Sequence, residues 1–156
     1  MNLKHLAAAM ALTSAAAWAA DTPGAIPNLP SPSVAERLAT ARKAIDAKDW
    51  SRASAELNVA VRQDPRNADV HNLLGYTYRK RPAPDLVKAF EHYQMALRID
   101  PRHKGAHEYI GEAYLLDKRL PEAERHLAEL EKICGGTACE EYRDLAQSIT
   151  DFKARP

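Results

Sequence analysis

Apolar residues recur along most of this chain at intervals of three and four positions, the spacing of one face of an α-helix. One such stripe runs from about 68 to 80 and includes Val70, Leu74 and Tyr78. A second runs from about 85 to 98, and Pro101 follows it where a proline typically ends a helix. The pattern therefore predicts two consecutive helices joined by a short turn.

This pair of stripes occurs three times. Small residues mark equivalent positions, since Ala41, Gly75 and Gly111 lie 34 and 36 residues apart. The middle copy reads His71-x2-Leu74-Gly75-x2-Tyr78, then Ala89-x3-Tyr93, then Pro101; the third reads His107-x2-Ile110-Gly111-x2-Tyr114, then Ala123-x3-Leu127; the first reads Arg37-x2-Thr40-Ala41-x2-Ala44, then Ala53-x3-Leu57, then Pro65.

The repeated set resembles the tetratricopeptide repeat (TPR), which has a period of about 34 residues and the pattern W-x2-L-G-x2-Y, A-x3-F, P. The resemblance implies an all-α fold, an α-solenoid of three helix-turn-helix repeats at 34–67, 68–103 and 104–137. It also implies a surface for binding other proteins rather than a pocket for catalysis.

The small residues predict close contacts between helices. A glycine costs a helix about 1 kcal/mol relative to alanine, so a helix keeps one where a neighbour approaches closely. We expect Gly75 to face Ala89, and Gly111 to face Ala123, where the two helices of a repeat cross.

Two further features modify the plain repeat. Gly75 and Ala89 are 14 residues apart, against 12 in the other copies, which places a two-residue insertion in the turn 81–85, at the rim of the stack. Beyond 137, a stripe from Tyr142 to Phe152 predicts a capping helix within a C-terminal segment, 138–156. The polar side of that helix would hold Glu140, Arg143, Asp144 and Gln147.

The first 19 residues have the pattern of a signal peptide. Lys4 precedes an apolar run at 6–17, and Ala17-Trp18-Ala19 fits a cleavage site. An uncleaved amphipathic helix is the alternative. Residues 20–33 hold four prolines and predict an extended linker, with a proline-rich ligand as the other interpretation. The sequence thus predicts a small exported bacterial protein, periplasmic or secreted after cleavage, with no membrane span.

Charge and motifs argue against several functions. The net charge is +1, so no overall field favours nucleic acid. The chain lacks a Gly-rich phosphate loop, an H-E-x-x-H motif and a nucleophile elbow, so we expect no enzyme activity, cofactor or bound metal. His71 and His107 are interpreted as packing residues, and His92 and His126 as lying near the outside of the second helices.

The two cysteines, Cys134 and Cys139, flank a short segment with two glycines. In an exported protein they favour a structural disulfide that ties the last repeat to the cap. A reversible redox pair is a second interpretation, although the spacing is not C-x-x-C. A copper or zinc site is a third, with His103 and His107 as the outside donors.

The resemblance also implies where a partner binds, namely the first helix of each repeat. The implied partner-binding residues are Arg42, Asn72, Tyr76, Arg79, Lys80, Glu108, Tyr109 and Glu112. They would form a basic patch (Arg42, Arg79, Lys80) beside an acidic one (Glu108, Glu112), which suits a peptide of mixed charge; a solvated polar face is the alternative. The family's carboxylate clamp for chaperone C-termini is missing, because only Arg42 among its positions is basic.

These observations lead to three hypotheses. The first is a scaffold or adaptor in the periplasm or cell envelope that binds a protein or peptide. The second is an accessory factor of metal or redox maturation that uses Cys134 and Cys139. The third is self-association through the cap or the first helix.

Overall fold

The structure, a computed structural model, describes residues 30–155. The predicted signal peptide and most of the predicted linker lie outside these residues. The described part contains seven α-helices and no strand. In chain order the helices are α1 (Val34–Asp46), α2 (Trp50–Gln63), α3 (Ala68–Lys80), α4 (Leu86–Ile99), α5 (Lys104–Leu116), α6 (Leu120–Cys134) and α7 (Glu140–Lys153). The predicted helices at 68–80 and 85–98 correspond to α3 and α4.

Polar side chains at the helix starts explain these boundaries. Ser33 accepts a hydrogen bond from the Glu36 amide, and the Glu36 carboxylate accepts one from the Ser33 amide, which is a capping box. Asp49, Asn67 and Asp85 cap α2, α3 and α4 by accepting from the amide three residues on. The local sequence therefore sets where these four helices begin, whereas α6 and α7 start without a side-chain cap.

The turns within the repeats differ as expected. Residues 47–49 and 117–119 each form a three-residue turn, in which Lys48 and Lys118 have a positive φ of 57° and 59°. The turn between α3 and α4 has five residues, 81–85, and places the two-residue insertion where the sequence predicts it. There Arg81 Nε donates 2.7 Å to the Ala83 carbonyl, and the Asp85 amide donates 3.0 Å to the Tyr78 carbonyl. These bonds fix the longer turn without disturbing the helices.

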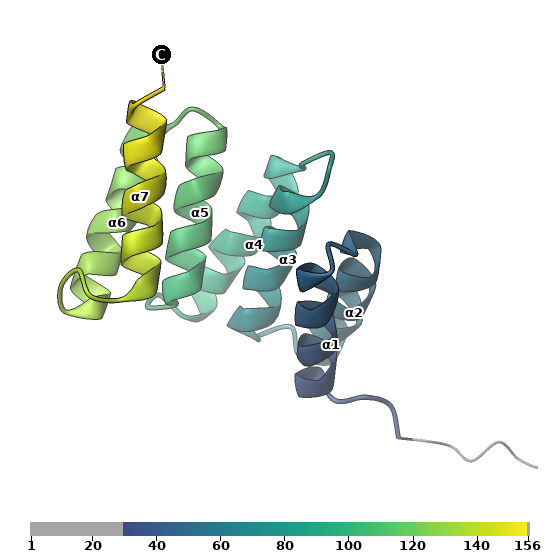
Figure 1. Cartoon of the computed structure of the whole chain (residues 1–156). Coiled ribbons are helices and arrows are strands. Elements are labelled where there is room, and N and C mark those ends of the chain that lie inside the picture. Colours follow the sequence, from purple (N-terminus) through teal and green to yellow (C-terminus); the bar gives the residue numbers. More distant parts are fainter. Residues whose placement is uncertain (1–29, 156) are drawn as a thin grey trace, which may run out of the picture. The chain divides into compact units, whose positions relative to one another are not determined.

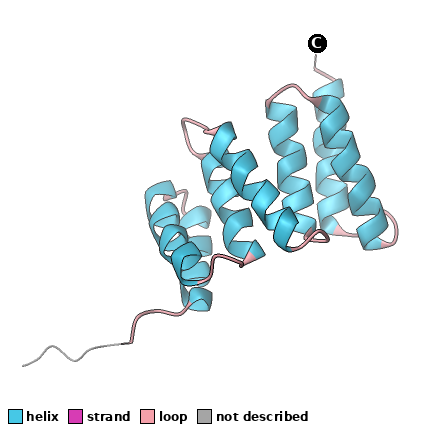
Figure 2. Cartoon of the chain, turned by 180° about the vertical axis from the view of Figure 1, so that it is seen from behind, coloured by secondary structure: helices cyan, strands magenta, loops and turns pink. Residues whose placement is uncertain are grey.

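The helices pack in consecutive pairs, α1 with α2, α3 with α4 and α5 with α6, and each pair packs on the next. Figure 1 shows α1, α3, α5 and α7 in front of α2, α4 and α6, and Figure 2 shows the same stack from behind. Alanines at the crossings, Ala41, Ala53, Ala89 and Ala123, are fully buried. The all-α solenoid of three helix pairs with a C-terminal helix is therefore confirmed.

The glycine neighbours differ from the prediction. A Cβ atom added at Gly75 would lie 2.6 Å from two ring carbons of Tyr93, and one added at Gly111 would lie 2.6 Å from a methyl carbon of Leu145. Close approach is therefore real, but the nearest atoms do not belong to Ala89 or Ala123. Gly111 makes room for the capping helix rather than for its own partner helix.

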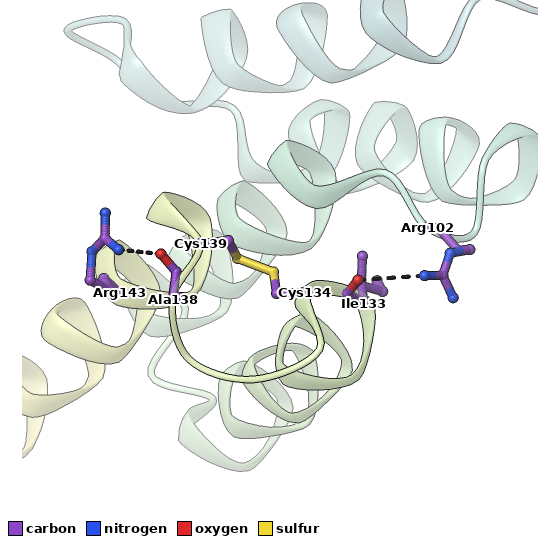
Figure 3. Close-up of a disulfide and its surroundings, with 6 residues drawn as sticks. All are labelled: Arg102, Ile133, Cys134, Ala138, Cys139 and Arg143. Carbon is purple, nitrogen blue, oxygen red and sulfur yellow. Dashed lines mark hydrogen bonds between the residues drawn. A yellow bond between two sulfur atoms is a disulfide. The ribbon is translucent and has the colours of Figure 1, made fainter.

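That helix, α7, packs on both α5 and α6. Leu145 and Ile149 are buried in one cluster with Leu130, while the four polar residues expected on its outer side are exposed. The connection to α6 is shown in Figure 3, where Cys134 and Cys139 Sγ atoms lie 1.98 Å apart, at disulfide distance. Arg143 donates to the Ala138 carbonyl in the same connection. None of the helices within 30–155 is long and apolar enough to cross a membrane.

Candidate protein-binding face

The candidate site lies on the inner face, by which we mean the surface of α3, α5 and α7 on the side away from α4 and α6. These three helices lie side by side, since α3 packs on α5 and α5 packs on α7 (Figure 1). Seven of the eight implied binding residues belong to α3 or α5. The eighth, Arg42, belongs to α1, where it is exposed and lies 3.9 Å from an Asp69 carboxylate oxygen.

Arg79 is the centre of this face, although only 5% of it is exposed. Its guanidinium carbon lies 5.3 Å from the Tyr76 ring centre and 5.6 Å from the Tyr109 ring centre. Its Nε donates 3.2 Å to the Tyr93 hydroxyl, and Nη2 lies 2.5 Å from Glu112 Oε2 without hydrogen-bond alignment. Arg79 therefore ties α3 to α4 and α5 and is not free to bind an anion.

The expected basic and acidic patches consequently do not stand side by side as free charges. Arg79 and Glu112 neutralise one another, and Glu112 also accepts a hydrogen bond of 3.2 Å from the Ser148 hydroxyl of α7. Lys80 is exposed, with its Nζ 5.9 Å from the Tyr76 ring centre. The Tyr76 and Tyr109 rings lie 4.8 Å apart between centroids. The two tyrosines thus enclose a cation of their own chain.

Two more of the implied residues are buried. Asn72 is 6% exposed, and its Oδ1 has no hydrogen-bond partner among the described residues. Glu108 is 9% exposed and forms no ion pair or side-chain hydrogen bond within residues 30–155. Burial raises the pKa of Glu108 to about 8, helped by the carboxylates of Glu112, Asp144 and Glu141 and opposed by Arg79. Glu108 is therefore mostly protonated at neutral pH.

A groove of about 550 Å³ opens on the inner face between the C-terminal halves of α5 and α7. Leu115, Leu116 and Phe152 form its apolar part, and Leu116 is 53% exposed. Its polar lining consists of Arg79, Glu112, Lys118, Ser148, Asp151 and Arg155. The groove combines exposed apolar surface with charges of both signs, which is what a peptide side chain with polar flanks requires.

Four of the five histidines within the described residues form two equivalent pairs that the sequence did not predict. His71 Nδ1 lies 3.1 Å from His92 Nδ1, and His107 Nδ1 lies 2.9 Å from His126 Nδ1. The Nε2 atoms of His71 and His107 each reach a proline carbonyl, at 3.1 Å and 3.0 Å.

The prediction that His92 and His126 lie near the outside is therefore wrong. Both are half-buried against the first helix of their repeat. Tyr78 stacks on His92 and Tyr114 stacks on His126, with ring centres 5.6 Å and 5.7 Å apart. The sequence contains a signal for this pairing. The separation of His71 and His92 along the chain is two residues longer than that of His107 and His126, and the turn of the middle repeat is longer by the same two residues.

Among the described residues, no three His, Cys, Asp or Glu side chains are placed so that they could hold a metal ion, so no metal-binding cluster there supports the maturation hypothesis. The two histidines named as outside donors are engaged elsewhere. His103 precedes α5 as its N-cap, accepts from the Ala106 amide and lies 3.1 Å from Asp69. His107 is bonded within its own pair.

Comparison with known proteins adds to this geometry. No family model matches the sequence, and no curated protein matches it. Solved structures do match. The TPR2B domain of yeast Sti1 in a pHsp70 complex has a TM-score of 0.68 and 15% identity, covering 77% of this chain and 95% of that one.

The first TPR of Spaghetti (RPAP3), bound to the HSP90 peptide SRMEEVD, has a TM-score of 0.66 and 14% identity, over 78% of this chain and 94% of that one. The first TPR domain of human RPAP3 has a TM-score of 0.64 and 13% identity, over 79% and 97%. The repeat spacing of the sequence and the similarity of the structure agree, and the chain has the fold of a tetratricopeptide-repeat domain.

Proposed function

We propose that this chain is a protein-interaction module that binds an extended segment of a partner protein on its inner face. The observation that carries the proposal is the groove between α5 and α7, because it presents exposed apolar surface beside fixed charges. Two of the similar domains were solved with a peptide or chaperone ligand, which supports the same role here. Export to the periplasm, where the module would act as an adaptor, remains part of the proposal.

The groove holds one of the two large apolar side chains that are strongly exposed among the described residues. Leu116 lines the groove and is 53% exposed, whereas Val87 lies on α4, outside the groove, and is 71% exposed. Both belong to helices and both reach solvent. A charge placed at either position should therefore leave the fold intact while changing different surfaces.

This contrast gives the test. A library of random linear peptides is selected on the immobilised full chain, and the enriched peptides are titrated against the parent, Leu116→Glu and Val87→Glu. We expect Leu116→Glu to weaken binding at least tenfold, about 1.4 kcal/mol, and Val87→Glu to leave it unchanged. Equal affinities of all three proteins, or no enriched peptide at all, would refute the proposal.

Alanine substitutions of Tyr76 and Tyr109 are less discriminating. Both rings contact Arg79, so their removal would also release a buried cation and alter the pair with Glu112. Weaker binding by such variants would not distinguish a lost peptide contact from a rearranged inner face.

A further inference from the structure

Glu108 is only 9% exposed and has no partner among the described residues, although its carboxylate oxygens still reach solvent. It lies in α5, four residues before Glu112, and no described residue pairs with it or donates a hydrogen bond to it. Carboxylates of residues this far removed from solvent are normally paired, because partial loss of hydration disfavours an unpaired charge. A position of this kind in a protein-binding face is explained if the missing partner arrives from outside.

The surroundings of Glu108 favour a cation. The charged groups acting on it are Glu112 on its own helix, Glu141 and Asp144 on α7, and Arg79 on α3. Arg79 is already committed to Glu112 at 2.5 Å. Glu141 and Asp144 form no ion pair with a described residue, so an excess of negative charge remains beside Glu108.

The acidic site and the groove follow one another along the same two helices. Glu108 precedes Leu115 by seven positions on α5, a distance of about 10 Å along the axis. On α7, Asp144 precedes Phe152 by two turns. An extended peptide covers about 10 Å in three residues, so one segment can reach both places.

We propose that Glu108, with Glu141 and Asp144, binds the cationic side chain of an arginine or lysine in the partner segment. This inference rests on the proposed function. An apolar residue three positions away in that segment would occupy the groove at Leu115, Leu116 and Phe152. The partner is thus a basic, partly apolar segment. The peptide of the similar HSP90 complex, SRMEEVD, carries three acidic residues and one arginine, so its side chains are acidic on balance. The preferred charge is reversed because this chain lacks the basic clamp and presents carboxyls.

Binding of such a cation must release a proton. In the chain without a bound partner the pKa of Glu108 is about 8, since burial and the neighbouring carboxylates favour its neutral form. An ammonium or guanidinium group beside it would favour the ionised form. Affinity should therefore rise with pH, by about tenfold between pH 7 and pH 9 if only the ionised form binds. The tyrosines on this face do not titrate there, because burial raises the pKa of Tyr109 to about 12.

The test uses random linear peptides selected on the full chain at pH 8.5. We expect the enriched peptides to share an arginine or lysine three positions from an apolar residue. Each is then resynthesised with norleucine in place of the cation, and this change should weaken binding at least tenfold. The parent chain, Glu108→Gln and the exposed control Glu91→Gln are titrated with the unmodified peptides from pH 6.5 to pH 9.

Glu108→Gln should bind the cationic peptide at least tenfold more weakly at pH 9 and lose the pH dependence, while Glu91→Gln should behave as the parent. Peptides that depend on Leu116 but lack a fixed cation, or whose affinity is independent of Glu108, would overturn this inference and leave the proposed function intact. Absence of any groove-dependent peptide would instead refute the proposed function itself.

Discussion

Gly75 provides the sharpest test of the packing between α3 and α4. Replacing it with alanine adds a single Cβ, which would lie 2.6 Å from Cδ1 and Cε1 of Tyr93 and 3.0 Å from Cγ. Carbon atoms prefer about 3.5–4.0 Å, so the overlap is about 1 Å on a rigid ring. Tyr93 is fully buried and its hydroxyl accepts from Arg79, and therefore the ring cannot move away without loss.

Two opposing contributions set the size of the effect. Alanine in place of glycine favours the helix by about 1 kcal/mol. Overpacking of a buried site costs about 1–3 kcal/mol. We therefore expect Gly75→Ala to lower the free energy of unfolding by about 1 kcal/mol, and the larger Gly75→Leu to lower it by more than about 2 kcal/mol.

The assay is urea denaturation followed by far-ultraviolet circular dichroism, with a double-mutant cycle. Gly75→Ala is measured in the parent and in the Tyr93→Leu background, where the ring is absent. In that background the substitution should be neutral or stabilising by up to about 1 kcal/mol. If Gly75→Ala stabilises the parent by the full helix-propensity gain, then the close approach to Tyr93 does not constrain this helix pair.

Three further predictions concern stability. The double substitution Cys134→Ser, Cys139→Ser should lower the free energy of unfolding by about 2 kcal/mol, the loop-closure effect of a short loop. Hydrogen exchange should increase only in α7. Two free thiols in protein from its native compartment would contradict a structural disulfide. Burial and the paired histidine lower the pKa of His92 and His126 to about 4, so unfolding takes up protons between about pH 6.5 and pH 4. The free energy of unfolding should therefore fall as the pH decreases through that window, by about 1 kcal/mol per pair after solvent screening. His126→Phe should make the melting temperature depend less on pH. The raised pKa of Glu108 has the opposite effect, so the free energy of unfolding should fall as the pH rises from about 4.5 to 8. Glu108→Gln should therefore stabilise the chain at pH 8 by about 1–2 kcal/mol after solvent screening. An unchanged or lower melting temperature would show that burial does not destabilise the charged form of this carboxyl.

A stabilising Glu108→Gln would also separate a binding residue from a structural one. A carboxyl that serves only the fold should destabilise the chain when it is neutralised. A carboxyl kept for a partner costs stability in the free chain and returns it on binding. Glu108→Gln is therefore expected to improve the fold and to impair binding of cationic peptides.

Much of the architecture follows from the sequence alone, because the helical period is a local property. The stripes around Leu74 and Tyr93 place the helices of the middle repeat, and Ser33 and Asp85 mark helix starts through hydrogen bonds within three residues. The longer interval from Gly75 to Ala89 places the insertion in the turn. Each of these signals spans one helix or one helix pair, and so a single sequence can carry it.

Which residues of one repeat contact the next repeat depends on the tertiary structure. Arg79 looked like one of three free cations, but Glu112 of the next repeat neutralises it. The sequence predicts that Gly111 faces Ala123 of its own repeat, yet the nearest atoms to an added Cβ belong to Leu145 of the capping helix. Glu108 lies mostly out of solvent and unpaired on α5, which packs against both α3 and α7. A repeat period fixes which side of each helix is apolar, but it does not fix which residue of the next helix lies opposite. The pairing and burial of charges on the inner face therefore depend on how the three helices are set against one another.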